Sequence, residues 1–191
     1  MIYLASQSPR RAELLRLANI PFQQFSVDID ETVLANEIPL SYLKRVITLK
    51  RIAAEAICRQ QDKPILVADT IVALEGEILT KPLNFETFCD YMSKLSGKWH
   101  QVLTVFALSY QGKVHEEVSI SEVLFARLLE LEIKQYWRTG EPQDKAGGYA
   151  IQGVGARFVK AFKGDFNNII GLPIDALKKA LDSLEIPMTK S

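Results

Sequence analysis

An acidic residue, Asp69, lies inside a long apolar stretch of the sequence. Ile65-Leu66-Val67-Ala68 precedes it and Ile71-Val72-Ala73-Leu74 follows it, so Asp69-Thr70 separates two runs of strand length. A carboxylate buried between such runs is costly unless it is paired, hydrogen-bonded or bound to a metal ion. We therefore predict a functional carboxylate at Asp69. The alternative is a turn acid that bonds only neighbouring backbone amides.

Two adjacent arginines, Arg10 and Arg11, stand in the first turn of a predicted helix. Ser8 can cap this helix, and Pro9 suits its first position. Because a helix N-terminus carries partial positive charge, two cations there call for a nearby anion. Helix N-termini bind phosphate, arginine pairs with phosphate oxygens, and Ser6 and Ser8 add hydroxyl donors. The pattern predicts a phosphate site, and the alternative places both arginines in water.

Two further segments could complete a site for a nucleotide. Lys81 precedes Pro82, which restricts the backbone and places the lysine at a defined loop end. In the run Gly147-Gly148-Tyr149-Ala150-Ile151-Gln152-Gly153, the glycines permit close backbone approach. Gln152 can read a base edge with one donor and one acceptor. The alternatives are a solvated lysine and a flexible loop, but the combined set suits phosphoanhydride chemistry on a nucleotide.

The elements that would position these residues alternate between strands and helices. Besides the two runs around Asp69, strands are predicted at Ile2 to Ala5, Phe22 to Val27, Val102 to Tyr110, Val114 to Phe125 and Arg157 to Phe162. Helices are predicted after Pro9, from Leu40 to Arg59, from Asn84 to Leu95, from Leu129 to Arg138 and from Gly171 to about Leu184. Leu43, Val46, Ile47 and Ile57 are expected on the buried side of the second helix. This order predicts an α/β fold with a mixed sheet and flanking helices, in one domain over residues 1–191.

The composition argues against two classes of partner. Hydrophobic residues make up 48% and charged residues 24% of the chain, which suits a packed core. The 23 basic and 23 acidic residues cancel, whereas nonspecific nucleic-acid or membrane binders usually carry an excess of Lys and Arg. We therefore expect neither a nucleic acid nor a membrane as partner. Two distant cysteines and the lack of a signal-peptide pattern lead us to expect a cytoplasmic location.

Taken in order, these motifs resemble those of the Maf family of nucleoside triphosphate pyrophosphatases. The resemblance covers nearly the whole chain. The segments that carry it are Leu4-Ala5-Ser6-Gln7-Ser8-Pro9-Arg10-Arg11, Glu13-Leu14-Leu15, Asp28-Ile29-Asp30-Glu31, Ala68-Asp69-Thr70, Lys81-Pro82, Leu95-Ser96-Gly97, Asp144-Lys145-Ala146-Gly147-Gly148-Tyr149 and Gly171-Leu172-Pro173. One departure is Arg51, which follows Lys50 where the family usually has a small residue, and which raises a question about the packing there.

The family has branches that differ in the base they prefer. One branch prefers dTTP and UTP, and another prefers 7-methyl-GTP. Arg10, Thr70 and Gln152 match the first branch, whereas the second usually has tryptophan, glutamine and an acid at these places. The resemblance thus implies hydrolysis of dTTP and UTP to the monophosphate and pyrophosphate. The alternatives are a 7-methyl-GTP or broad modified-nucleotide pyrophosphatase, and a non-enzymatic nucleotide-sensing regulator.

The resemblance also implies an arrangement and a set of roles. The fold would have two lobes around a deep cleft and would often pair into a homodimer. Water would attack the α-phosphorus and expel pyrophosphate. Asp69, Glu31 and Lys81 would be catalytic, with Asp69 and Glu31 also binding a divalent metal, Mg²⁺ or Mn²⁺. The substrate-binding residues would be Ser6, Arg10, Arg11, Lys50, Thr70 and Gln152.

Overall fold

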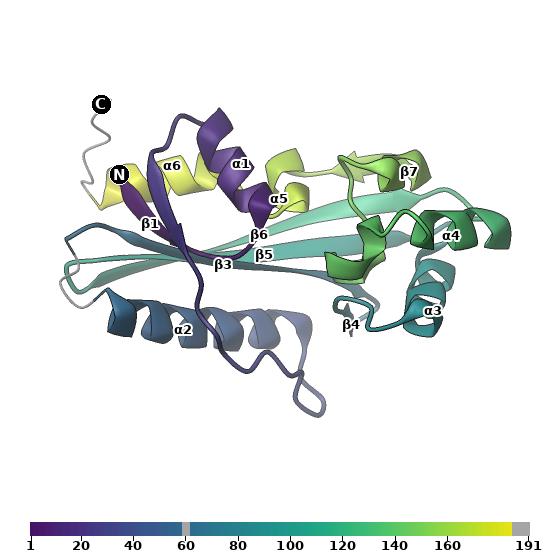
Figure 1. Cartoon of the computed structure of the whole chain (residues 1–191), viewed down its shortest axis with the longest axis horizontal. Helices are drawn as coiled ribbons and strands as arrows, with labels where there is room; N and C mark the ends of the chain where they lie inside the picture. The colour runs from purple at the N-terminus through teal and green to yellow at the C-terminus, as the bar shows by residue number, and fades with distance from the viewer. Residues whose placement is uncertain (59–61, 185–191) are drawn as a thin grey trace.

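The computed structural model describes residues 1–58 and 62–184. Within these residues, seven strands form one mixed sheet along the molecule, and helices lie on both of its faces (Figure 1). The strands are β1 (Ile2–Ala5), β2 (Phe22–Phe25), β3 (Ile65–Leu74), β4 (Glu77–Leu79), β5 (Trp99–Tyr110), β6 (Lys113–Phe125) and β7 (Val159–Lys163). The helices are α1 (Pro9–Leu17), α2 (Pro39–Ile57), α3 (Phe85–Leu95), α4 (Glu130–Trp137), α5 (Phe166–Ile170) and α6 (Ile174–Ser183), with 3₁₀ segments η1 (Glu141–Asp144), η2 (Ala146–Gly148) and η3 (Val154–Phe158). The predicted α/β class with a mixed sheet is confirmed.

The strand order is β2-β1-β3-β5-β6-β7, and β4 pairs with β3 outside this path. β1 runs parallel to both β2 and β3, and every other pairing is antiparallel. A parallel pair needs a crossover, and α1 supplies it between β1 and β2. β5 and β6 are joined at Gln111 and Gly112, whose φ values of 49° and 78° are those of a type I′ turn.

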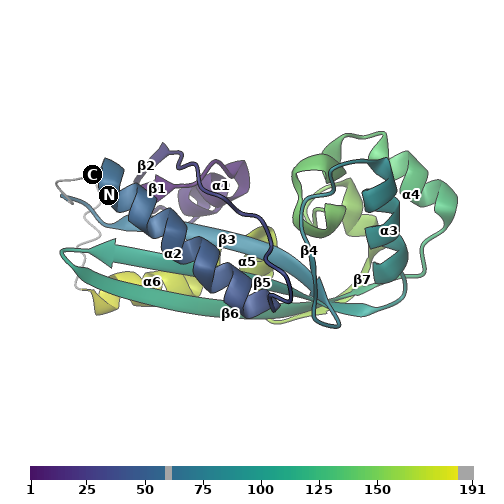
Figure 2. The same ribbon diagram turned by 90° about the horizontal axis from the view of Figure 1, so that it is seen from below.

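Two layers of helices enclose the sheet, as Figure 2 shows from the side of α2. α2 covers one face, whereas α1, α5 and α6 cover the opposite face. Side chains alternate along a strand, so the odd-numbered apolar residues of β3 pack with α2 and the even-numbered ones pack on the other side. Asp69 therefore shares the face of α2, and Thr70 shares the face of α1 and α5.

A gap in strand pairing on one edge of β3 marks the position of Asp69 and Thr70. β1 pairs with β3 only as far as Leu66, and β4 pairs with the same edge only from Val72 onward. Among the described residues, the five positions between them have no strand on that side. The N-terminus of α1 follows the end of β1, so it lies beside this gap. Side chains from α1 can therefore reach residues on both faces of β3.

β3 is one continuous strand, which corrects the prediction of two runs separated by Asp69-Thr70. Its pairing with β5 is unbroken from Ile65 to Ala73. The alternative that Asp69 is a turn acid is therefore wrong. The polar residues Asp69 and Thr70 fit in this strand because side chains from neighbouring elements can reach them past its open edge.

α2 follows the predicted pattern over most of its length. Leu43, Val46 and Ile47 are buried as predicted, and Lys50 continues the same buried stripe. The prediction for Ile57 is wrong: it is 60% exposed, and Cys58 packs against the core at the helix end instead. Arg59, the predicted last residue of the helix, lies outside the described residues.

Other corrections concern element ends. Ser8 stands at the N-cap of α1 but makes no side-chain capping bond, and its N–H donates to Ser6 Oγ at 3.2 Å. Residues 154–158 form η3, so the strand predicted from Arg157 begins at Val159. Asn84 caps α3 as predicted and accepts a hydrogen bond from the Thr87 N–H.

None of the helices described in residues 1–58 and 62–184 has the length and apolar character needed to cross a membrane.

Candidate active site

A lysine joins two of the predicted acids in a single cluster. The Lys50 ammonium lies 2.8 Å from a Glu31 carboxylate oxygen and 3.3 Å from an Asp69 oxygen. The Lys50 side chain is 11% exposed and that of Asp69 15%, so water screens the contact between them only in part. A buried carboxylate is costly without a partner, and Lys50 supplies one for Asp69. The sheet thus brings together residues far apart in sequence.

Arg11 is buried beside this cluster. Its Nε–H donates to the Gly171 carbonyl at 2.9 Å, while its two terminal nitrogens donate to Ser6 Oγ at 3.0 Å and Thr70 Oγ1 at 3.1 Å. One terminal nitrogen also lies 3.7 Å from Asp69. Burial lowers the pKa of Arg11, and the Asp69 carboxylate opposes that shift. The alternative that Arg11 points into water is wrong.

The hydroxyl groups around Arg11 have assignable directions. Thr104 donates its hydroxyl proton to the Asn168 carbonyl at 3.1 Å, so it acts as acceptor in its 2.9 Å bond with Thr70. Thr70 thereby accepts from Arg11 and donates to Thr104. Ser6 accepts from Arg11 and from the Ser8 N–H, which leaves its own proton for another acceptor. The site therefore keeps a Ser6 donor available, whereas Thr70 is occupied in holding Arg11.

Arg10 has a different environment from Arg11. It is half-buried. Burial lowers its pKa, and the carboxylate of Asp144 in η1 raises it in part. The two arginines in the first turn of α1 thus each face a protein carboxylate, Asp69 for Arg11 and Asp144 for Arg10. This resolves part of the electrostatic conflict seen in the sequence and places the start of α1 near the η1–η2 segment.

Lys81 and the glycine run are brought together by the segment after β4. The Gly147 N–H donates to the Thr80 carbonyl at 3.1 Å. A Cβ on Gly147 would lie 2.7 Å from Val72, and one on Gly148 would lie 2.9 Å from Phe88. Both glycines have positive φ, which other residues rarely adopt. The run is therefore packed against the fold rather than flexible here, and Lys81 is exposed next to it.

The predicted site residues fall into two groups. Ser6, Arg11, Lys50, Asp69, Thr70 and Glu31 form one network of direct contacts. Lys81 and Gln152 are exposed and belong to the segments around η2, outside that network. Arg10 stands between them through its electrostatic interaction with Asp144. The structure thus separates a charged cluster, buried except for the exposed Glu31, from a more open polar group.

Residues that the sequence reasoning did not single out hold Glu31 in place. The Tyr42 hydroxyl donates to the Glu31 carbonyl at 3.0 Å. Arg45 donates to both Glu37 oxygens at 2.7 Å and to the Thr32 carbonyl at 2.9 Å. The hydrogen bond from Arg45 lowers the pKa of Glu37 to about 2. These contacts depend on how the loop before α2 folds back onto that helix, so they could not be predicted from local sequence patterns.

Thr104 and Asn168 are further residues that the sequence reasoning missed. Both are fully buried. Asn168 donates to the Val102 carbonyl and to Ser121 Oγ, which ties α5 to β5 and β6 behind Thr70. A polar residue in the middle of the apolar β5 run was a usable signal for Thr104. Asn168 had none, because its role depends on distant strands.

The unusual Arg51 is accommodated without disturbing Lys50. It is half-buried and donates to both oxygens of Glu55, one turn further along α2, at 2.8 and 2.9 Å. An ion pair at this spacing stabilises a helix modestly. Arg51 thus has its partner on α2 itself, and its packing does not involve the contact between Lys50 and Asp69.

The acids present are compatible with a divalent cation. The carboxylates of Glu31 and Asp69 both contact the Lys50 ammonium, so they lie within a few ångströms of a common point. Mg²⁺ is commonly held by one or two carboxylates, with phosphate and water oxygens completing its shell. Within the part of the chain that the structure describes, no group of three or more His, Cys, Asp or Glu could hold a metal by itself. A cation held by Glu31 and Asp69 would take its remaining oxygens from substrate phosphate or from water.

Comparison with known proteins identifies relatives along nearly the full chain. The family described as Maf-like protein matches residues 1–184. A dTTP/UTP pyrophosphatase of Pseudoalteromonas translucida is 44% identical over 182 residues, covering 95% of this chain and 96% of the relative. One of Saccharophagus degradans is 41% identical, covering 98% and 90%. A nucleoside triphosphate pyrophosphatase of Haemophilus ducreyi is 40% identical, covering 100% and 98%. The chain therefore belongs to the Maf-like protein family.

Proposed function

We propose that this chain hydrolyses dTTP and UTP to the nucleoside monophosphate and pyrophosphate. The observation that carries the proposal is the cluster in which Asp69 contacts both Lys50 and Arg11 beside the open edge of β3. This cluster pairs an acid able to act on water with cations able to hold phosphate oxygens. The names of the relatives supply the substrate class.

The cations would act on the triphosphate. Of the five N–H donors of a guanidinium, Arg11 uses three in bonds to the protein, which leaves two for phosphate oxygens. Its three bonds fix the guanidinium before substrate arrives, so little reorganisation is needed. The free Ser6 proton, Arg10 and the exposed Lys81 would add contacts. Substrate phosphate would also draw Lys50 away from the carboxylates it now bridges.

Asp69 would handle the attacking water, with Glu31 as the second carboxylate. A bound divalent cation would neutralise phosphate charge and lower the pKa of a coordinated water. Asp69 and Glu31 would hold that cation, and Asp69 would accept the water proton. Pyrophosphate would leave from the α-phosphorus as the water oxygen bonds to it. Arg11 and Lys81 would stabilise the charge that develops on the leaving group.

Base choice would depend on the more open part of the site. Gln152 is exposed and neutral, so its amide can pair with the carbonyl and N–H edge of a pyrimidine. A 7-methylated guanine is cationic, and Arg10 would disfavour it. Thr70 would influence selection through Arg11, because its hydroxyl already bonds Arg11 and Thr104. These residues favour dTTP and UTP over 7-methyl-GTP, and Asp69 with Lys81 favours turnover over nucleotide sensing.

The proposal also includes the arrangement implied by the family resemblance. It comprises one domain over residues 1–191, two lobes around a deep cleft, a homodimer and a cytoplasmic location.

A single experiment tests the chemistry. The purified chain is incubated with UTP, dTTP, ATP, GTP and 7-methyl-GTP plus Mg²⁺, and the products are identified. We expect UMP or dTMP with equimolar pyrophosphate; release of a diphosphate with orthophosphate, or no turnover of either pyrimidine nucleotide, would refute the proposal.

A further inference from the structure

A tyrosine and a glutamate form a hydrogen-bonded pair beneath the segment that carries Gln152. The Tyr136 hydroxyl, on α4, donates to a Glu141 carboxylate oxygen at 2.5 Å. The same hydroxyl accepts from the Ala150 N–H at 3.1 Å. Glu141 also accepts from the Val154 N–H at 2.8 Å and the Gly155 N–H at 3.0 Å. The pair thus bonds the backbone on both sides of Gln152.

Two glycines make this approach of side chains to backbone possible. A Cβ on Gly153 would lie 2.5 Å from the Glu141 Cδ and closer still to a carboxylate oxygen. A Cβ on Gly155 would lie 2.5 Å from the Tyr136 hydroxyl oxygen. Gly153 has a φ of −109°, which any residue can adopt. The need for glycine at position 153 therefore comes from the neighbouring carboxylate and not from backbone strain.

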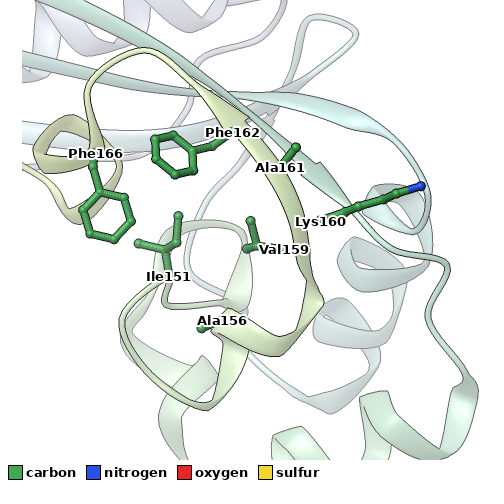
Figure 3. Close-up of a pocket in the computed structure, with 7 residues that line it drawn as sticks. All are labelled: Ile151, Ala156, Val159, Lys160, Ala161, Phe162 and Phe166. Carbon is green, nitrogen blue, oxygen red and sulfur yellow. The ribbon is translucent and has the colours of Figure 1, made fainter.

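The chain next to Gln152 is also held by apolar packing. Ile151 is 9% exposed and lines a shallow groove with Val159 and Phe166, among other residues. Figure 3 shows the Ile151 side chain directed into this groove. Gln152 itself is exposed. Gln152 is thus presented to solvent from a segment that is held by the packing of Ile151 and by the hydrogen bonds of Tyr136 and Glu141.

Glu141 is ionised in this arrangement. Burial raises its pKa, but the hydrogen bonds from Tyr136, Gly155 and Val154 outweigh burial and lower the pKa below its ordinary value. An ionised carboxylate only accepts hydrogen bonds, which matches the three donors around it. A glutamine has the same shape but one acceptor oxygen, and its NH₂ group would face a backbone N–H. Glu141→Gln therefore breaks the arrangement with little change in volume.

We infer that Tyr136 and Glu141 are positioning residues that set the conformation of residues 150–155 and so orient Gln152 toward the base of the substrate. The inference rests on the proposed function for the identity of that base. It assigns to both residues a part in base selection without contact to the reacting phosphates. A residue of this kind should affect substrate binding more than the chemical step.

The first test measures kcat and KM for UTP and 7-methyl-GTP with Glu141→Gln. We expect UTP KM to rise about tenfold with kcat changed less than about threefold, and the preference for UTP to fall. Glu130→Gln is the matched control, because Glu130 is an exposed acid on α4 whose side chain pairs with Lys134 on the same helix. Tyr136→Phe keeps the buried ring and removes the hydroxyl that bonds Glu141 and the Ala150 N–H, so it should shift KM in the same direction. Unchanged KM and preference in both Tyr136→Phe and Glu141→Gln would overturn the inference.

A double-mutant cycle tests the contact between Glu141 and Gly153. Gly153→Ala should raise UTP KM about tenfold in the wild type, because the new Cβ displaces the carboxylate. In a Glu141→Ala background that carboxylate is gone, so the same substitution should have less than about a threefold effect. Equal effects in both backgrounds would contradict the inference, since the two residues would then act independently.

Amide hydrogen exchange supplies a readout that needs no turnover. The Val154 and Gly155 amide protons should exchange at least about tenfold faster in Glu141→Gln than in the wild type and the Glu130→Gln control. Equal rates would refute the positioning role even if activity changed. If the wild type hydrolyses no nucleotide, the proposed function fails, and the exchange rates still decide whether Glu141 fixes this segment.

Discussion

Arg11→Lys tests the geometry of the buried cluster while keeping its charge. A lysine carries its three donors on a single nitrogen, so we expect it to replace only one of the bonds that the three Arg11 nitrogens make to Gly171, Ser6 and Thr70. Two buried acceptors lose a donor, at about 1–2 kcal/mol each, so the free energy of unfolding should fall by about 2–4 kcal/mol. For a chain of this size that corresponds to a fall in Tm of roughly 5–15 °C.

The assay is thermal and urea unfolding of both proteins at pH 7, followed by UTP kinetics. Arg16→Lys is the matched control, because Arg16 lies on the same helix, is exposed, pairs with the exposed Glu13 and lies over the Phe22 ring, contacts that a lysine can largely keep. We expect the control to change stability by less than about 0.5 kcal/mol. We also expect Arg11→Lys to raise the UTP KM, since the guanidinium that would receive phosphate is no longer fixed. An Arg11→Lys protein with wild-type Tm would refute the reasoning.

Three further predictions concern metal, base and pH. Activity should be lost in EDTA and restored by Mg²⁺ or Mn²⁺; full activity after exhaustive chelation would contradict the metal role of Glu31 and Asp69. Wild type should favour UTP and dTTP over 7-methyl-GTP by at least about tenfold in kcat/KM, a difference of ~1.4 kcal/mol. Joint replacement of Arg10, Thr70 and Gln152 by Trp, Gln and Glu should shift the preference toward 7-methyl-GTP, and an unchanged preference would contradict their role in base choice. Burial lowers the pKa of His100 from 6.5 to about 4, so the unfolded chain takes up this proton first. The free energy of unfolding should therefore fall by about 3 kcal/mol between pH 6.5 and pH 4. In His100→Gln, the free energy of unfolding measured with urea at each pH should fall less steeply over this range.

The elements of the fold were largely predictable, because periodicity and caps are local signals. The start of α1 at Pro9 and the Asn84 cap of α3 follow from residues next to them. Strand pairing is not local. β3 continues through Asp69 because it pairs with β5 along this whole stretch, and its other edge is open there because β1 ends. Two polar residues between apolar runs reveal neither pairing.

The candidate site was predictable in residue type but not in partnership. A lone acid in an apolar run and two arginines at a helix start both pointed to Asp69 and Arg11. Arg11 bonds Thr70 and Gly171 instead of pointing into solvent. These partners follow from the packing of α1 against β3 and α5, which the sequence does not show. The role of Glu141 was hidden for the same reason, since its donors come from positions 13 and 14 residues away.

The most direct test of the central claim is the rate of pyrophosphate release from UTP by Asp69→Asn. This substitution keeps the shape of the side chain and removes the negative charge that contacts Lys50 and Arg11. We predict a folded protein whose kcat is lower by about 10²–10⁴-fold, as expected for loss of a general base. A folded Asp69→Asn protein that keeps more than about half of the wild-type turnover would contradict it.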